Sequence, residues 1–181
     1  MDFIQEVSSF LSPELCQSIL DDIVAGFVQF EKNDYNIHSN AYEAREIESN
    51  PILKDRIARC EELISQQVYN YFVQYDIKTF EQKLTGVSVL YVESGGSIPK
   101  HTDEQIDDTL FRNIGVLLYL NKTIGGELCF PLQKRVITPD IGKLVIFPSL
   151  FTHPHMVLPN TGTGRYALRF SYGQEIKSVH I

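Results

Sequence analysis

Two short stretches of the chain carry residues that could bind one metal ion together. In "PKHTDEQ", His101 and Asp103 are two residues apart, so an extended chain presents their ring nitrogen and carboxylate on the same side. In "THPHMVLPNTGTGRYALRF", His153 and His155 have the same spacing, and alternation does not decide which of them is a ligand. An H-x-D tripeptide alone is more often a surface turn than a metal site.

The combination of two histidines and one carboxylate predicts a particular coordination geometry. This set is the facial triad of non-haem Fe(II) oxygenases, in which three protein ligands occupy one face of an octahedron and leave three positions open. Open positions are where a co-substrate and oxygen bind. We therefore expect an iron site that contains His101, Asp103 and a histidine near residue 155.

Two arginines on one predicted strand indicate an acidic ligand. Arg165 and Arg169 share a strand face with Ala167 and Ser171, whereas bulky side chains occupy the opposite face. A guanidinium is always charged and its shape suits a carboxylate, so an arginine that faces the interior implies an acidic partner. The alternative for either arginine is a solvated position on the strand surface.

Composition and charge limit the classes of protein and partner. The chain has 181 residues, 43% of them hydrophobic, which suits one globular domain with a real core. Its formal charge is -7 without a run of basic residues, which disfavours nucleic acid as a partner. Three widely spaced cysteines favour reduced thiols. No secretory leader or apolar run of membrane length occurs, so we expect a cytoplasmic protein without a membrane partner.

The first half of the chain predicts two helices separated by a loop. Ser12 with Pro13 and Asn50 with Pro51 are helix-start signals, and apolar residues follow each at helical spacing. Residues 31–46 are polar and aperiodic, which predicts a long loop. The apolar stripe of the second helix is Ile52, Leu53, Ile57, Cys60, Leu63, Ile64, Val68 and Phe72.

After residue 80 the pattern changes to short β-rich runs separated by glycine and proline. Such runs are typical of a compact barrel or double sheet rather than of alternating strands and helices. We expect the helices to pack on this β-structure. The runs are residues 84–92, 114–121, 126–130, 143–148 and 165–172.

Several motifs occur in the order of a known family: "FLSPELC", Tyr91, "HTD", "YLN", "GGELCFP", "KLVIFPS" and "HMVLPNTGTGRYAL". With them the chain resembles the prolyl 4-hydroxylase-like branch of the 2-oxoglutarate and Fe(II)-dependent dioxygenases. The resemblance implies an α+β fold with a double-stranded β-helix core, which is a jelly-roll of the cupin-like kind. One catalytic domain would span residues 1–181, with helical support and a loop in residues 1–80 and the β-core in residues 81–175.

The resemblance also distinguishes between the paired residues. In the family, the distal histidine is followed four residues on by proline and about ten residues on by a basic residue that precedes an aromatic. His155, Pro159 and Arg165 fit this spacing. The resemblance therefore implies that Fe(II) is bound by His101, Asp103 and His155, and that Arg165 holds the C5 carboxylate of 2-oxoglutarate.

Further residues match family positions around that carboxylate. Tyr91 and Tyr119 correspond to tyrosines whose hydroxyls assist its binding, and Leu128 is expected to line the same pocket. The alternative for both tyrosines is packing in the core. The implied reaction consumes O2 and 2-oxoglutarate, with ascorbate as a possible stimulant, and hydroxylates a substrate. Asp103 favours hydroxylation over halogenation, because related halogenases lack the carboxylate.

The resemblance favours a prolyl residue in a peptide or protein as the substrate. A free amino acid or another small molecule is the alternative, and a catalytically silent metal-binding sensor or scaffold is a third hypothesis. Long polar loops are usually functional or disordered. We therefore expect Arg169 and the segments 31–46 and 104–112 to contact the substrate, the first segment through Tyr35 and Tyr42.

Overall fold

The computed structural model describes residues 2–32, 40–44, 51–78, 82–106 and 110–175. Helices dominate the first half of this part of the chain, and strands dominate the second half. The elements, in chain order, are β1 (Gln5–Val7), α1 (Pro13–Asp22), the π-helical turn η1 (Ile23–Phe27), β2 (Glu31–Lys32), β3 (Ala41–Ala44), α2 (Pro51–Gln74), β4 (Lys83–Val92), β5 (Ile98–His101), β6 (Gln105–Ile106), β7 (Leu110–Tyr119), β8 (Leu128–Phe130), β9 (Arg135–Ile137), β10 (Leu144–Pro148), β11 (His155–Val157) and β12 (Arg165–Glu175).

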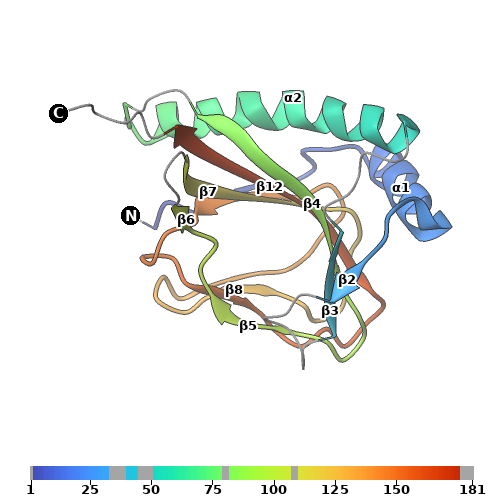
Figure 1. Cartoon of the computed structure of the whole chain (residues 1–181). Helices are drawn as coiled ribbons and strands as arrows, with labels where there is room; N and C mark the ends of the chain where they lie inside the picture. The colour runs from blue at the N-terminus through green and yellow to red at the C-terminus, as the bar shows by residue number, and fades with distance from the viewer. Residues whose placement is uncertain (1, 33–39, 45–50, 79–81, 107–109, 176–181) are drawn as a thin grey trace.

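Two antiparallel sheets face each other. The larger sheet has the strand order β1-β10-β7-β12-β4-β3-β2, with β6 paired to β7, and the smaller sheet has the order β5-β11-β8-β9. Figure 1 shows the smaller sheet, labelled at β5 and β8, opposite the long strands β4, β7 and β12. This arrangement is a jelly-roll core, so the fold class expected from the sequence is confirmed.

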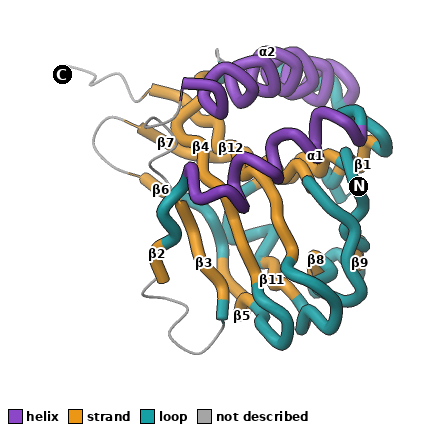
Figure 2. The backbone as a smooth tube through the Cα atoms, turned by 90° about the vertical axis from the view of Figure 1, so that its right-hand side faces the viewer, coloured by secondary structure: helices purple, strands orange, loops and turns teal. Residues whose placement is uncertain are grey.

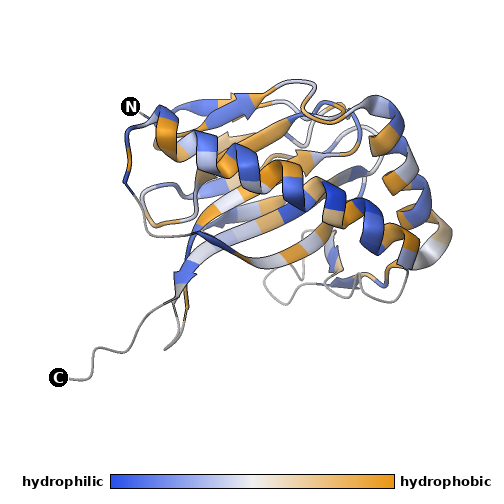
Figure 3. Ribbon diagram, turned by 90° about the horizontal axis from the view of Figure 1, so that it is seen from above, coloured by the Kyte–Doolittle hydropathy of each residue, from blue (hydrophilic) through white to orange (hydrophobic). Residues whose placement is uncertain are grey.

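The helices cover the outer face of the larger sheet, with α2 lying across it (Figures 1 and 2). The side chain of Ser12 caps α1 by accepting a hydrogen bond from the backbone N–H of Leu15 at 3.3 Å, as the sequence predicts. No helix in the described ranges is long and apolar enough to cross a membrane. Seen from above, α2 carries hydrophilic and hydrophobic residues along its outer side (Figure 3).

The buried stripe of α2 differs in part from the predicted one. Ile52 and Leu63 are 57% and 50% exposed, and Tyr71 is buried instead. The difference follows from geometry, because a helix that packs on a sheet buries one face only. The buried residues are Leu53, Ile57, Cys60, Ile64, Val68 and Tyr71.

Alternation along the long strands divides the apolar residues into two cores. On one face of β12, Leu168 and Phe170 pack with the helices. On the other face, Ala167 packs inside the barrel with residues that include Tyr119 and Leu128. Arg165 and Arg169 have the same parity as Ala167, so β12 directs two arginines toward the barrel interior.

The prediction of a long loop at residues 31–46 is wrong in part. Strand β3 pairs with β4, and β2 pairs with β3, so this segment extends the larger sheet. The exposed edge of β4 offers backbone hydrogen bonds that compensate for the weak strand propensity of alanine and glutamate. The register places Glu43 opposite Leu90 and directs its side chain into the barrel.

Candidate active site

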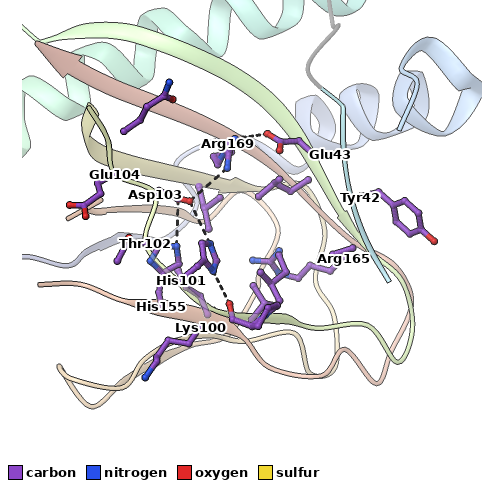
Figure 4. A pocket seen from close by; sticks show the side chains of 18 of the residues that line it. Tyr42, Glu43, Lys100, His101, Thr102, Asp103, Glu104, His155, Arg165 and Arg169 are labelled. Atoms are coloured by element: carbon purple, nitrogen blue, oxygen red, sulfur yellow. Dashed lines mark hydrogen bonds and ion pairs between the residues drawn. The ribbon is translucent and has the colours of Figure 1, made fainter. Parts of the chain in front are cut away.

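The two sheets enclose a cavity of about 730 Å³. His101, Asp103 and His155 line it from the smaller sheet and the loop after β5, and Arg165 and Arg169 line it from β12. Figure 4 shows these side chains converging on one space between the sheets. Residues far apart in the sequence are thus brought together as potential ligands of a metal and of an anion.

The two histidines and the aspartate form a compact cluster. Antiparallel pairing of β5 with β11 places His101 directly opposite His155, and their ring centroids are 4.5 Å apart. Nε2 of His101 lies 3.5 Å from Oδ1 of Asp103, and Nε2 of His155 lies 3.5 Å from Oδ2. One ligand atom from each residue lies within 4.8 Å of the other two. This separation allows all three to bind one ion.

Backbone carbonyls orient both imidazole rings. Nδ1 of His101 lies 2.8 Å from the carbonyl oxygen of Pro99, and Nδ1 of His155 lies 3.1 Å from that of His153. With the proton on Nδ1, each ring donates to the carbonyl two residues earlier and turns its Nε2 toward Asp103. Metal-binding histidines are commonly fixed through the second nitrogen in this way.

The charges of the cluster are coupled. Burial alone raises the pKa of Asp103, but hydrogen bonds from His101 and His155 and the charge of Arg169 outweigh it and hold this pKa well below its usual range. Burial lowers the pKa of His101, but the hydrogen bond and charge of Asp103 reverse this effect and raise it above its ordinary value. The cluster therefore offers a stable carboxylate, as a cation site requires.

The structure separates His153 from His155. Strand β11 begins at His155, so His153 lies in the preceding turn and the shared strand face does not extend to it. Nε2 of His153 lies 2.7 Å from the carbonyl oxygen of Asp2, and its Nδ1 lies 2.9 Å from Oγ1 of Thr152. His155 lines the cavity. His153 instead connects the turn to the N-terminal segment.

Arg165 is a fully buried cation with unsatisfied donors. Its Nη2 donates to the hydroxyl of Tyr119 at 3.3 Å, and its guanidinium carbon lies 4.9 Å from the centre of the Tyr119 ring. Nε and Nη1 have no hydrogen-bond partner within the described part of the chain. A buried guanidinium with free donors is costly unless an anion completes it. The cavity that Arg165 lines, together with Leu128, therefore fits a carboxylate ligand.

Gly126 provides space for Arg165. Its φ of +69° lies in the left-handed region that favours glycine. A Cβ at this position would lie 3.0 Å from Cδ of Arg165. The glycine therefore allows the arginine stem to pass beside the backbone between β7 and β8.

A comparison with protein families agrees with this geometry. Residues 87–172, which include the histidine and aspartate cluster and Arg165, match the sequence model described as the 2OG-Fe(II) oxygenase superfamily. Residues 87–172 of the chain thus form a region of this superfamily. The protein is a 2-oxoglutarate and Fe(II)-dependent dioxygenase, as the resemblance implied, and Fe(II) and 2-oxoglutarate are its cofactor and co-substrate. No curated protein matches the sequence.

Solved structures resemble this oxygenase over nearly its whole length. A viral collagen prolyl hydroxylase from Paramecium bursaria Chlorella virus-1, in complex with 2OG, has a TM-score of 0.72 at 18% identity, with 95% of this chain and 96% of that chain covered. A Trichoplax adhaerens prolyl hydroxylase, in complex with a hypoxia inducible factor peptide, has a TM-score of 0.69 at 22% identity, with 95% of this chain and 84% of that chain covered. HygX from Streptomyces hygroscopicus, with nickel, 2-oxoglutarate and hygromycin B bound, has a TM-score of 0.68 at 10% identity, with 95% of this chain and 83% of that chain covered. At these identities, the likenesses show a shared fold and nothing beyond it.

The expectation for Tyr91 in this oxygenase requires correction. Tyr91 pairs with Tyr166 in the β4–β12 register, on the face opposite Arg165, and the two rings stack with centroids 4.5 Å apart. Its ring therefore cannot reach the carboxylate that Arg165 would hold. Tyr119 does lie against Arg165 inside the barrel. Burial raises the pKa of Tyr119 although Arg165 opposes the shift, so the hydroxyl keeps its proton near neutral pH.

The tyrosines expected to contact substrate are only partly described. Tyr35 lies outside the described residues. Tyr42 belongs to β3 at the edge of the cavity, but its ring stacks on Tyr91 at 5.8 Å and points away from the metal-binding cluster (Figure 4). In the second predicted segment, Glu104 and Arg112 line the cavity, and residues 107–109 lie outside the described residues.

Arg169 lies between the cluster and a carboxylate that the sequence did not reveal. Its Nη1 is 3.8 Å from Oδ1 of Asp103, and its Nη2 forms an ion pair with Oε1 of Glu43. Glu43 is 5% exposed and lies in the segment predicted as a loop. A buried acid in an aperiodic polar segment gives no strand signal, and only the pairing of β3 with β4 places it in the site.

Proposed function

We propose that this oxygenase hydroxylates a prolyl residue of a peptide or protein. The observation that carries the proposal is the joint placement, in one cavity of about 730 Å³, of a histidine and aspartate cluster and a buried arginine whose Nε and Nη1 have no partner among the described residues. Pockets for drug-sized ligands measure roughly 300–1,000 Å³, so this cavity has room beyond a five-carbon diacid. The fold likeness to prolyl hydroxylases that act on collagen or bind a peptide supports the prolyl class.

In this proposal, four side chains of the cavity have defined tasks. His101 and His155 would hold Fe(II) through their imidazole nitrogens and Asp103 through a carboxylate oxygen. Arg165 binds the C5 carboxylate of 2-oxoglutarate through Nε and Nη1, the donors that have no partner within the described residues. The bound iron and co-substrate supply the oxidation of a substrate C–H bond to an alcohol by O2, with 2-oxoglutarate converted to succinate and carbon dioxide.

Tyr119 and Leu128 support this arrangement. The Tyr119 oxygen accepts from Arg165, which leaves its own O–H free to donate to the same carboxylate. Leu128 is fully buried and excludes water from the pocket wall. Excluding water strengthens the interaction of Arg165 with an anion, because charge interactions are stronger in a low-dielectric site.

The experiment that tests the proposal compares substrates of different size. The protein is incubated with Fe(II), ascorbate and 2-oxoglutarate together with a panel of proline-containing peptides, and separately with free proline. Mass spectrometry is expected to detect the gain of one oxygen atom on a prolyl residue of a peptide, with matching succinate. Oxidation of free proline alone would contradict the peptide assignment and favour a small-molecule hydroxylase.

The hypothesis that the protein is a catalytically silent scaffold is tested with the same samples. An active enzyme forms succinate slowly even without its prime substrate, through uncoupled turnover. The His155→Ala variant provides the background. Succinate formation equal to this background in the wild-type protein would contradict any oxygenase activity.

A further inference from the structure

Arg169, which is partly buried, and Glu43, which is buried, form an ion pair beside the candidate metal ligands (Figure 4). The side chains of Arg169 and Glu43 are 18% and 5% exposed, and they come from strands that are not neighbours in the sheet, β12 and β3. A buried charge is strongly destabilising when its partner is removed, whereas an exposed pair contributes little. This ion pair is shielded from solvent beside the cluster, so it is not an ordinary surface ion pair.

An arginine at this position would, by itself, oppose cation binding. Its Nη1 lies 3.8 Å from Oδ1 of Asp103, which also faces Nε2 of His101 at 3.5 Å. A guanidinium that paired fully with Asp103 would compete with a metal ion for the same carboxylate. The Glu43 carboxylate pairs with Nη2 of the guanidinium and offsets its charge, while Nη1 faces Asp103 at 3.8 Å.

We propose that Arg169 and Glu43 are positioning residues for the metal site. Glu43 fixes the guanidinium of Arg169, and Arg169 in turn restricts rotation of the Asp103 carboxylate so that one orientation faces the ion. Partners that orient the ligands of a metal site typically change metal affinity or activity by about 10- to 100-fold when they are removed. The inference rests on the proposed metal site.

The alternative for Arg169 is direct contact with the prime substrate, as expected from the sequence. Three observations favour positioning: the guanidinium already has a carboxylate partner, that partner is buried, and a second carboxylate 3.8 Å away belongs to a candidate metal ligand. A substrate-binding arginine would instead be expected to keep donors free for the ligand, as Arg165 does.

The test measures binding of Co(II) alone, without 2-oxoglutarate, by calorimetry and by the visible d–d absorption of the bound ion. Glu43→Gln is expected to weaken Co(II) binding about 10-fold, because Arg169 loses its counter-charge and turns onto Asp103. Arg169→Gln removes a positive charge, so its Co(II) affinity is expected to be no weaker than that of the wild type. Its d–d spectrum is nevertheless expected to change, because Asp103 is no longer held in one orientation.

The double variant Glu43→Gln with Arg169→Gln separates charge from orientation. The net charge beside the cluster then equals that of the wild type, so Co(II) affinity is expected to return to within about threefold of it, with the altered spectrum retained. Glu43→Asp and Arg169→Lys keep the charges and serve if the neutral variants do not fold. For these variants the expected result is near wild-type affinity with a shifted spectrum.

Arg56→Gln is the matched control, since Arg56 pairs with Asp22 between α1 and α2, away from the cavity. It is expected to leave Co(II) affinity and spectrum unchanged. Wild-type affinity and spectrum in both Glu43→Gln and Arg169→Gln, with only a higher KM for the prime substrate, would overturn the inference. A wild-type protein that binds Co(II) no better than His155→Ala would instead contradict the proposed metal site itself.

Discussion

The hydroxyl oxygen of Tyr119 lies 3.3 Å from Nη2 of Arg165, and neither side chain is exposed to solvent. This contact involves one nitrogen of the guanidinium, and the other two, Nε and Nη1, have no partner within the described part of the chain. Tyr119 therefore holds Arg165 in place without neutralising it. The remaining positive charge is available to an anion that enters the cavity.

Arg165→Ala is expected to weaken 2-oxoglutarate binding far more than it weakens metal binding. The substitution leaves the C5 carboxylate of the ligand without a cation, and truncating such a buried pair costs on the order of 2–5 kcal/mol. Calorimetric titration of 2-oxoglutarate into the Mn(II)-loaded protein measures the effect. Tyr119→Phe, which keeps the charge, is expected to cost about 1 kcal/mol. Equal 2-oxoglutarate affinity in Arg165→Ala and the wild type would exclude Arg165 as the anchor.

His155→Ala and His153→Ala are expected to affect different properties. His155→Ala removes a ligand atom of the cluster and should abolish binding of Mn(II). His153→Ala breaks the contact with the carbonyl oxygen of Asp2, so it should lower the melting temperature while leaving Mn(II) binding largely intact. Calorimetry and thermal melting measured on both variants distinguish the two. Loss of metal from His153→Ala alone would reverse the assignment.

Gly126→Ala is expected to impair 2-oxoglutarate binding through Arg165. The added Cβ would lie 3.0 Å from Cδ of Arg165 and would displace the arginine stem. Gly95→Ala is a matched control, because Gly95 has a φ of +80° but no atom within 4 Å of the built Cβ. Both variants carry the same type of backbone strain. If both lose 2-oxoglutarate affinity equally, strain rather than displacement of Arg165 is the cause.

Metal affinity is expected to fall as the pH decreases through the pKa of His101. In the metal-free protein this pKa lies above the ordinary value of 6.5, because Asp103 stabilises the charged ring more than burial destabilises it. The protonated ring stabilises the folded protein below the ordinary pKa, and this contribution is lost as the pH rises through the folded value. The metal needs the neutral ring, so binding at a pH below the pKa of His101 should release a proton, and the release should decline as the pH rises through that pKa.

Calorimetry of Mn(II) binding in buffers of different ionisation enthalpy counts the released protons. His153→Ala is the control, since it keeps all three candidate ligands and is expected to release the same number of protons as the wild type. Asp103 should not contribute, because its pKa is held well below the usual range and the carboxylate is already ionised. Proton release that does not decline as the pH rises through the pKa of His101 would contradict this origin.

The local start signals of the helices and the spacing of the site motifs could be read from the sequence. Ser12 caps α1 and Pro51 begins α2, as predicted. Capping and the fixed φ of proline act within a few residues, so these signals can be read locally. His101, Asp103 and His155 were expected to approach one another, and they do. The choice of His155 over His153 came from resemblance, and the structure gives the reason in the start of β11.

Strand register is the information that the sequence did not provide. The pairing of Tyr91 with Tyr166 turns Tyr91 away from Arg165, and a shift of one residue would have reversed its direction. Glu43 was missed for the same reason, since β3 becomes a strand only through its pairing with β4. Both errors concern which face of a strand a residue occupies, which depends on contacts distant in the chain.

The two sheets that hold the candidate ligands differ in strand length. Arg165 and Arg169 lie on β12, which has 11 residues and pairs with β4 and β7, of 10 residues each, whereas His101 and His155 lie on strands of 4 and 3 residues. Short strands with few hydrogen bonds open more readily by local unfolding. Amide hydrogens of β5 and β11 should therefore exchange faster than those of β12 in the metal-free protein, and a bound ion should slow them selectively.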